Sequence, residues 1–212
     1  MANGSKLKIW GRVTSSNVKK VLCVADELKI PYERIEAGGK FGIVDTPEYR
    51  KLNPNGRVPT IEDGGYVLWE SNSIMRYLAM KYGGAALYPA EPATRASIDR
   101  WLDWQLSVIV PADVPLFFGT IRTPPDKHDK AAIDAGAKKL AEVHKILDAA
   151  LAGKSYLVGD RLTLADIALG MYAHRYYANP HFEKAEFPHM KAWYERLRQW
   201  LPYNVHVDVP LE

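Results

Sequence analysis

The chain has 212 residues, a net charge of +3 and a single cysteine, Cys23. This length allows one or two domains with hydrophobic cores of their own, whereas one cysteine excludes an internal disulfide framework and a zinc site built from cysteines. The weak positive charge does not by itself indicate nucleic-acid binding, and no apolar run reaches the ~18 residues of a membrane span, so we expect a soluble, cytoplasmic protein.

Short strands and helices alternate along the first part of the chain. Four apolar runs have the length of strands: residues 7–10, 32–36, 58–62 and 66–69. Apolar residues recur at helical spacing in residues 16–29 and 71–82, the second with Ser71 as a candidate N-cap and Gly83 just beyond its end. The glycine-containing connection between the last two strands predicts a hairpin. Residues 38–57, rich in glycine and proline, are interpreted as loop.

Helical patterns dominate the rest of the chain, after a connector at residues 83–91. Four stretches carry the helical period: residues 93–110, 129–152, 163–177 and 188–200. The chain is therefore predicted to contain an α/β domain at residues 1–82 and an all-helical domain at residues 92–212. The first carries 13 Lys and Arg against 9 Asp and Glu, a balance of +4, which leaves −1 for the remainder.

The turn between the first strand and the first helix contains Thr14, Ser15, Ser16 and Asn17. A helix N-terminus offers free backbone N–H groups and the positive end of the helix dipole, which favour an anion such as a thiolate. A serine hydroxyl can donate a further hydrogen bond to that thiolate. Simple N-capping explains the same residue types, so this segment alone predicts no chemistry.

Two further segments could hold a peptide ligand. If the bond before Pro59 is cis, the backbone N–H and C=O of Val58 are free for an extended peptide; an ordinary proline at a strand start is the alternative. Glu70 could bind an ammonium group, and Ser71 with its N–H a carboxylate; a helix cap is the alternative. One acidic residue beside a helix start suits an α-amino acid head, which carries both charges.

In this order, the segments resemble the cytosolic glutathione transferase family. The stretches that carry the resemblance are NPNGRVP at 53–59, WESNSI at 69–74, RYLAMKYG at 76–83, LYP at 87–89 and GDRLTLADI at 159–167. It covers nearly the whole chain. The resemblance implies a thioredoxin-like α/β domain with a mixed sheet that binds glutathione (1–82), a linker (83–91) and an all-α domain that forms the electrophile pocket (92–212).

The resemblance also bears on the residue that activates glutathione, which in this family is Tyr, Ser or Cys near the first helix. No tyrosine lies before Pro31, and Cys23 falls two turns into the helix among apolar neighbours, where we expect a buried small hydrophobe. The chain is therefore similar to the serine-type members (bacterial theta-, phi- or beta-like). Ser15 matches their position as a donor to the thiolate, with Ser16, Thr14 and Asn17 as alternatives.

By resemblance, Val58 with Pro59 pairs with the cysteinyl backbone of glutathione, and Glu70 with Ser71 holds its γ-glutamyl head. Arg57 and Lys40 are candidates for the glycine carboxylate; Arg57 could instead reach a partner chain, and Lys40 could be a solvated loop lysine. The electrophile pocket draws on aromatic and apolar side chains that could equally belong to the core: Trp10, Trp104, Val108, Pro111, Phe117, Phe118, Tyr172 and Tyr176.

The implied function is a glutathione S-transferase that conjugates its co-substrate glutathione to small hydrophobic electrophiles in detoxification, with glutathione peroxidase activity as a further expectation. A homodimer without nucleic-acid or membrane partners is expected. No metal is expected, because the six histidines lack ligand spacing. The alternatives are a non-catalytic ligand- or protein-binding module of the same fold and a thiol-disulfide oxidoreductase acting through Cys23.

One motif of the helical half has a structural interpretation only. Thr163 and Asp166 lie three residues apart, the spacing of a capping box with Asp in place of Glu. They are predicted to start a buried helix from Leu164 to Tyr177. We expect no direct catalytic role for this motif.

Overall fold

The computed structural model describes residues 6–212 and divides into two compact units, of which the first ends at Tyr88 and the second begins at Pro89. The division falls inside the connector expected at residues 83–91. Each unit is described separately below. Along the described residues, no helix combines the length and the apolar character that crossing a membrane requires.

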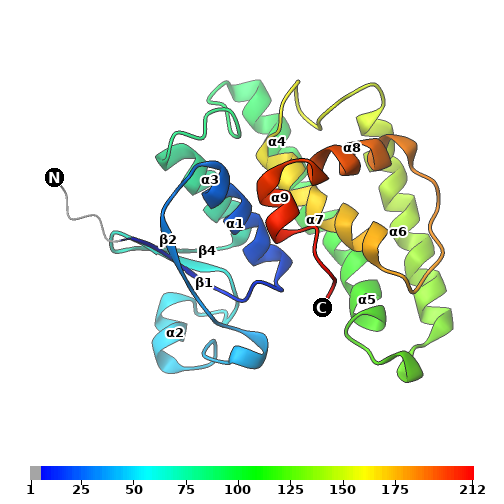
Figure 1. Ribbon diagram of the computed structural model, residues 1–212, viewed down its shortest axis with the longest axis horizontal. Helices are drawn as coiled ribbons and strands as arrows, with labels where there is room; N and C mark the ends of the chain where they lie inside the picture. The colour runs from blue at the N-terminus through cyan, green and yellow to red at the C-terminus, as the bar shows by residue number, and fades with distance from the viewer. Residues whose placement is uncertain (1–5) are drawn as a thin grey trace. The chain divides into compact units, whose positions relative to one another are not determined.

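The first unit is built on a mixed sheet of four short strands (Figure 1). The strands are β1 (Leu7–Trp10), β2 (Tyr32–Ile35), β3 (Thr60–Asp63) and β4 (Tyr66–Trp69). Their order across the sheet is β2-β1-β3-β4; β1 and β2 are parallel, and β3 runs antiparallel to both β1 and β4. This arrangement confirms the predicted mixed sheet and its late hairpin.

The register of these strands brings four chain segments to one edge of the sheet. Trp10 at the end of β1 lies opposite Ile35 at the end of β2 and Thr60 at the start of β3, and Thr60 lies opposite Trp69 at the end of β4. The loops that continue from these positions therefore emerge side by side. This row of loops positions the candidate site.

Three helices complete the first unit: α1 (Ser16–Glu27), α2 (Pro47–Leu52) and α3 (Ser71–Lys81). Helices α1 and α3 lie on one side of the sheet and α2 on the other (Figure 1). Helix α2 and a short 3-10 turn, η1 (Gly39–Phe41), fall in the stretch predicted as loop. Helix α2 has six residues, too few to show a helical period in the sequence. Its N-cap is Thr46, whose hydroxyl accepts a hydrogen bond from the Tyr49 N–H.

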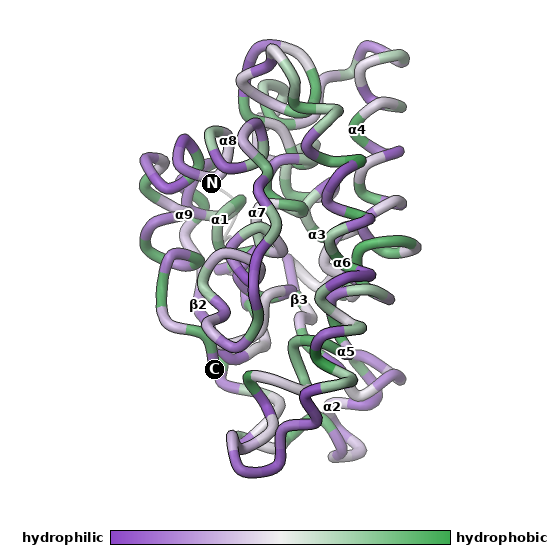
Figure 2. Tube along the Cα trace, turned by 90° about the vertical axis from the view of Figure 1, so that its right-hand side faces the viewer, coloured by the Kyte–Doolittle hydropathy of each residue, from purple (hydrophilic) through white to green (hydrophobic). Residues whose placement is uncertain are grey.

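The second unit is helical. Its elements are α4 (Pro92–Trp104), the π-helical turn η2 (Gln105–Ile109), α5 (Val110–Thr120), the 3-10 turn η3 (Pro125–Lys127), α6 (Lys130–Leu151), α7 (Leu164–Ala178), α8 (Pro188–Arg198) and α9 (Leu201–His206). Hydrophobic and hydrophilic residues alternate along α4 (Figure 2), where Ile98 and Leu102 are buried. The helix predicted to end at residue 110 instead continues through η2 and α5, although α5 contains Pro115.

The predicted capping box is present at the start of α7, which spans Leu164–Ala178. The Asp166 carboxylate is fully buried and accepts four hydrogen bonds, each 2.9 Å long. The donors are the Thr163 N–H, the Thr163 hydroxyl, the Leu157 N–H and the Trp193 indole N–H. Burial raises the pKa of Asp166, and these donors oppose that shift. Asp166 thus joins α7, α8 and the preceding loop.

His144 on α6 is a fully buried histidine, and neither ring nitrogen has a hydrogen-bond partner among the described residues. Its ring packs edge-on against Tyr176 at 4.6 Å and Phe187 at 5.9 Å between centroids. Burial lowers its pKa to about 3, because the apolar surroundings disfavour the imidazolium form. The histidine is therefore neutral in the folded protein at neutral pH.

Replacing His144 by leucine should remove an acid-dependent loss of stability. Below pH 6.5 the unfolded chain protonates this histidine and the folded chain does not, so the free energy of unfolding of the wild type falls as pH decreases, by about 1.4 kcal/mol per pH unit. Denaturant unfolding should show the H144L variant gaining about 2.5 kcal/mol on the wild type between pH 6.5 and pH 4.5. The exposed His189 gives the control H189L; parallel pH profiles for wild type and H144L would contradict the account.

Candidate functional site

Four loops meet along the edge of the sheet where β1, β2 and β4 end and β3 begins. In the order of the strands they carry Gly38 after β2, Ser15 after β1, Val58 before β3 and Glu70 after β4. Adjacent strands lie about 4.8 Å apart, so this edge spans roughly 14 Å. An extended tripeptide is roughly 10 Å long, so the row of loops has the length to hold one.

Ser15 is the N-cap of α1, in extended conformation with φ −84° and ψ 118°. Its carbonyl accepts the Lys19 N–H at 2.9 Å, but its hydroxyl makes no capping hydrogen bond. The side chain is half-buried at the point where the first N–H groups of the helix have no intrahelical acceptor. The hydroxyl and these N–H groups are therefore available to an anion.

The three alternatives to Ser15 are placed differently. Ser16 is the first residue within α1, and Thr14 lies in the turn before it. Asn17 is engaged, because its Oδ1 accepts a hydrogen bond from the Ser71 hydroxyl at 3.3 Å. This bond joins the beginning of α1 to the beginning of α3.

The segment before β3 is fixed by its neighbours. The peptide bond between Val58 and Pro59 is cis. The Arg57 carbonyl accepts hydrogen bonds from the Tyr49 hydroxyl at 2.7 Å and from the Asn53 amide at 2.9 Å. The backbone N–H and C=O of Val58 have no hydrogen-bond partner among residues 6–212, which leaves them available to an extended peptide. The sequence did not indicate the support from Tyr49, whereas Asn53 is the first residue of the NPNGRVP stretch.

The beginning of α3 differs from the sequence prediction by one residue. Glu70, not Ser71, is the N-cap, and it has a positive φ of 71°, which is uncommon for a residue other than glycine. Ser71 is the first helical residue and is buried, with its hydroxyl bonded to Asn17. The Glu70 side chain is exposed and makes no capping hydrogen bond, so its carboxylate is available to a cation.

Lys40, Arg57 and Trp10 were further candidates at this end of the chain. Lys40 is exposed on η1, with its ammonium nitrogen 5.3 Å from the centre of the Phe41 ring. Arg57 has an exposed side chain. Trp10 donates its indole N–H to Glu62 at 2.8 Å and packs edge-on against Tyr49 of α2. The Trp10 ring is therefore engaged on the α2 side of the sheet.

The second unit places the other electrophile-pocket candidates in two groups. Three lie along the continuous helix from α4 to α5 and are partly or fully exposed: Trp104, Val108 and Pro111, of which Val108 belongs to the π-helical turn. Phe118 is also exposed, at 57%. The other three are buried: Phe117, Tyr172 and Tyr176. Turns of π-helix occur frequently at functional sites.

The buried candidates are held by specific contacts. The Tyr172 hydroxyl accepts a hydrogen bond from the Gln105 amide at 3.0 Å, and burial raises its pKa. Phe117 lies under the guanidinium of Arg175, 3.9 Å from the ring centre. Tyr176 packs against His144 and donates its hydroxyl to the Ala185 carbonyl at 3.1 Å. Tyr176 is therefore a residue of the helical core.

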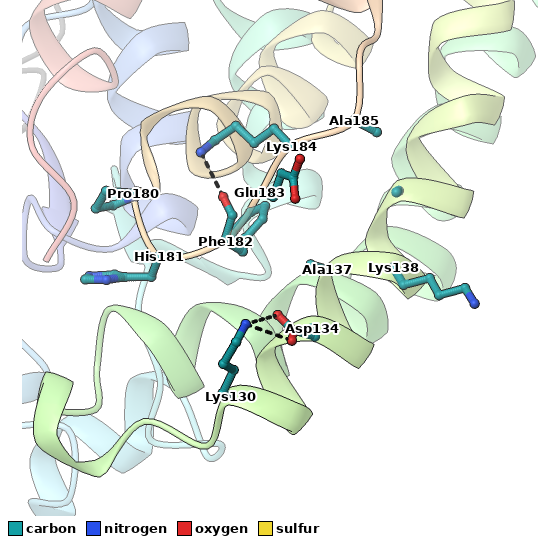
Figure 3. Close-up of a pocket in the computed structure, with 11 residues that line it drawn as sticks. Lys130, Asp134, Ala137, Lys138, Pro180, His181, Phe182, Glu183, Lys184 and Ala185 are labelled. Atoms are coloured by element: carbon teal, nitrogen blue, oxygen red, sulfur yellow. Dashed lines mark hydrogen bonds and ion pairs between the residues drawn. The ribbon is translucent and has the colours of Figure 1, made fainter.

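An open groove of about 850 Å³ lies in the second unit between α6 and residues 180–185 (Figure 3). Its walls carry none of the predicted site residues. Lys130 pairs with Asp134 at 3.0 Å, and the Lys184 ammonium donates to the Asn179 carbonyl at 2.6 Å. Lys130, Asp134 and Lys184 therefore each have a partner within the protein.

Cys23 is buried within α1, and burial raises the pKa of its thiol, with Asp26 adding to the shift. Reactive cysteines are partly exposed and have lowered pKa values, so the position does not favour an oxidoreductase acting through Cys23. Between residues 6 and 212, no group of three or more His, Cys, Asp and Glu side chains is arranged to hold a metal ion.

Both units match known protein families over most of their length. Residues 5–80 match the family model of the glutathione S-transferase N-terminal domain, and residues 104–199 match that of the C-terminal domain. The glutathione S-transferase GstB of Escherichia coli K12 is 39% identical over 207 residues, which cover 97% of this chain and 99% of GstB. Glutathione S-transferase 3 of Zea mays is 34% identical over 197 residues, 90% of this chain and 88% of the maize protein.

The chain also resembles a solved glutathione S-transferase structure. The theta class glutathione S-transferase of Xanthomonas axonopodis pv. citri, with glutathione bound, superposes with a TM-score of 0.92 at 48% identity, covering 97% of this chain and 99% of that one. The thioredoxin-like first unit and the helical second unit agree with this likeness. On its sequence and on its fold, the chain belongs to the glutathione S-transferase family.

Proposed function

We propose that the protein is a glutathione S-transferase that binds glutathione along the loop-bearing edge of the first unit and transfers its thiolate to small hydrophobic electrophiles. The observation that carries this proposal is the placement of Ser15, Val58 and Glu70 on adjacent loops of one sheet edge. Each offers an unsatisfied group of the kind that one part of glutathione requires. The relatives named glutathione S-transferase support the same activity.

Each loop has a separate role in the proposal. Val58 pairs its free N–H and C=O with the cysteinyl backbone of glutathione, with Pro59 fixing the chain direction after it. The exposed carboxylate of Glu70 holds the ammonium group of the γ-glutamyl head, and Ser71 contributes its backbone N–H to the head's carboxylate at the start of α3. The cysteinyl side chain then extends toward Ser15 on the adjacent loop.

In the proposed reaction, bound glutathione loses its thiol proton to solvent, and the thiolate attacks the electrophile. A C–S bond forms, and the leaving group departs with its electron pair, or the charge is taken up by the acceptor in an addition. Ser15 donates a hydrogen bond to the thiolate and is not itself a nucleophile. A free thiol has a pKa near 8.5, and lowering it by one unit corresponds to about 1.4 kcal/mol of preferential stabilisation of the thiolate.

Replacing Glu70 by glutamine should raise the KM for glutathione about tenfold, because the charge-assisted hydrogen bond to the ammonium group becomes a neutral one. The kcat at saturating glutathione should change little, since Glu70 does not contact sulfur. Steady-state kinetics with varied glutathione checks this. The matched control is E48Q, which removes an exposed carboxylate from the same unit; an unchanged KM in E70Q would remove Glu70 from the proposed site.

The activity itself is tested by a screen of alkyl and aryl halides, epoxides and hydroperoxides with glutathione. Turnover of electrophiles supports the transferase, and turnover of hydroperoxides adds the peroxidase activity expected from the sequence. Retention on immobilised glutathione without turnover of any compound would instead support the non-catalytic binding module. A homodimer in the cytoplasm fits the same proposal, and analytical ultracentrifugation tests the dimer.

A further inference from the structure

Arg175 on α7 forms a buried ion pair with Asp113 on α5. Its Nη1 atom donates to the Asp113 Oδ2 atom at 2.5 Å, and the two side chains are 14% and 3% exposed. Further along the same two helices, the Asn179 amide donates to the Thr120 hydroxyl at 2.8 Å. The guanidinium of Arg175 is therefore held at a fixed place between α5 and α7.

One edge of this guanidinium has no partner. The Nε and Nη2 atoms of an arginine lie together on one edge, which can bind a carboxylate through two parallel hydrogen bonds. In Arg175 the bond to Asp113 uses Nη1, and neither Nε nor Nη2 has a hydrogen bond within residues 6–212. The Nε atom is fully buried, and a buried donor without an acceptor costs free energy. The side chain remains 14% exposed, so a ligand from outside the chain can supply the missing acceptor.

Aromatic rings lie against the guanidinium. Its Cζ atom is 3.9 Å from the centre of the Phe117 ring and 5.4 Å from that of Tyr172, and both rings are buried. The guanidinium of Arg122 is also near Phe117, at 5.7 Å from the ring centre. Arg175 therefore lies in surroundings of low polarity, where a hydrogen bond to a charged group is stronger than in water.

Arg198 in the same unit shows the contrast. Its Nη1 atom pairs with Glu195 at 2.9 Å and its Nε atom with Asp208 at 2.8 Å, so carboxylates of the protein already occupy the donors of that arginine on both sides. Arg175 is more deeply buried than Arg198, which is 39% exposed. Arg175 thus combines burial, a fixed position and a free pair of donors.

An apolar stripe on α5 runs next to the residues that hold Arg175. Val110, Val114 and Phe118 follow one another at four-residue spacing and are half-buried or exposed. Each of the last two comes one residue after Asp113 or Phe117, so the two rows are neighbours on the helix surface. The same helix therefore offers apolar surface for the body of a small molecule beside the ion pair.

Resting on the proposed function, we infer that Arg175 binds a carboxylate of the electrophile through its free edge, so that the protein prefers electrophiles that carry a carboxylate on an apolar body. The thiolate of glutathione attacks the electrophilic carbon and not the carboxylate. With a benzyl halide, a C–S bond forms and the halide departs with its electron pair. Arg175 contacts the substrate away from the reacting atoms and determines specificity, whereas Asp113 is a positioning residue that acts through Arg175.

A matched pair of benzyl halides tests the inference: para-(chloromethyl)benzoate and its methyl ester, which differ in the carboxylate alone. For each compound, kcat/KM at saturating glutathione is divided by the rate constant of the uncatalysed reaction with glutathione. The wild type should favour the carboxylate about ten- to a hundredfold, the range expected for hydrogen bonds to a charged group, and mainly through a lower KM. R175Q should lose that factor for the carboxylate and change less than about threefold for the ester.

Variants of the ion pair separate substrate binding from a structural role. D113N removes a negative charge beside the guanidinium and should keep the preference for the carboxylate, whereas a purely structural pair would make D113N and R175Q lose activity alike with both compounds. The double variant R175Q/D113N leaves no buried charge unpaired, so it replaces R175Q if that variant does not fold, and it should show no preference. The control R196Q replaces an exposed arginine of α8 and should match the wild type.

Two results would overturn the inference alone. One is a wild type that turns over both compounds at the same normalised rate. The other is an equal loss with carboxylate and ester in R175Q, which would mean that Arg175 only supports the packing of α5 against α7. Turnover of neither compound by the wild type would overturn the proposed function and the inference with it, and is distinguishable from both.

Discussion

Replacing Asp166 by alanine should lower the free energy of unfolding by about 4 kcal/mol or more. The Asp166 carboxylate is fully buried and accepts hydrogen bonds from the Leu157 N–H, the Thr163 N–H and the Trp193 indole, as well as the Thr163 hydroxyl. Each buried donor left without an acceptor costs about 1–3 kcal/mol. Denaturant unfolding followed by circular dichroism measures the loss.

The matched control is D160A. Asp160 is close to Asp166 in sequence, but it is exposed and pairs with its neighbour Arg161 at 3.2 Å. Its replacement should change the free energy of unfolding by no more than about 0.5 kcal/mol. The D166N variant keeps one carbonyl acceptor and should lie between alanine and wild type, which gives a measurable value if D166A does not fold. If D166A lowers the free energy of unfolding by less than about 1 kcal/mol, the structural role of the Asp166 carboxylate is contradicted.

Replacing Ser15 by alanine should lower kcat/KM about ten- to a hundredfold with a good electrophile. The hydroxyl of this N-cap makes no capping bond, so its removal costs the helix little. A hydrogen bond to a charged group contributes about 1.5–3 kcal/mol. Losing this bond would therefore raise the pKa of the bound thiol by about one to two units. Because the proposed contact of this hydroxyl is with the sulfur alone, we expect the KM for glutathione to stay near that of the wild type.

Two further variants make this result specific. S15T keeps a hydroxyl at the N-cap and should retain more activity than S15A. S16A removes the hydroxyl of the next residue, which is already inside α1, and should behave like the wild type. Full activity in S15A together with a loss in S16A would transfer the role to Ser16 and contradict the assignment made here.

Local patterns predicted most of the secondary structure. Residues 7–10 and 66–69 are strands with the predicted bounds, and the helix from Leu164 ends one residue from its predicted end. The failures have local physical causes. Helix α2 is too short to show a period, and the extension through α5 contains Pro115, a residue that normally argues against a helix interior.

The site was predictable only in part. The resemblance suggested Ser15, Val58 and Glu70, but the hydrogen bond from the Tyr49 hydroxyl to the Arg57 carbonyl joins α2 to the segment before β3, and no local pattern contains it. The predicted N-cap of α3, Ser71, was wrong by one residue. The N-cap is Glu70, whose positive φ is a conformation that glutamate rarely adopts.

The central claim is that this edge of the sheet stabilises the thiolate of glutathione. Titrating the ultraviolet absorbance of the thiolate against pH, with glutathione bound to the wild type and to S15A, tests it most directly. We expect the wild type to lower the pKa of the bound thiol by a unit or more below the value of about 8.5 for a free thiol, and S15A to move it back toward that value. A bound thiol that titrates like free glutathione in the wild type, or identically in both proteins, would contradict the claim.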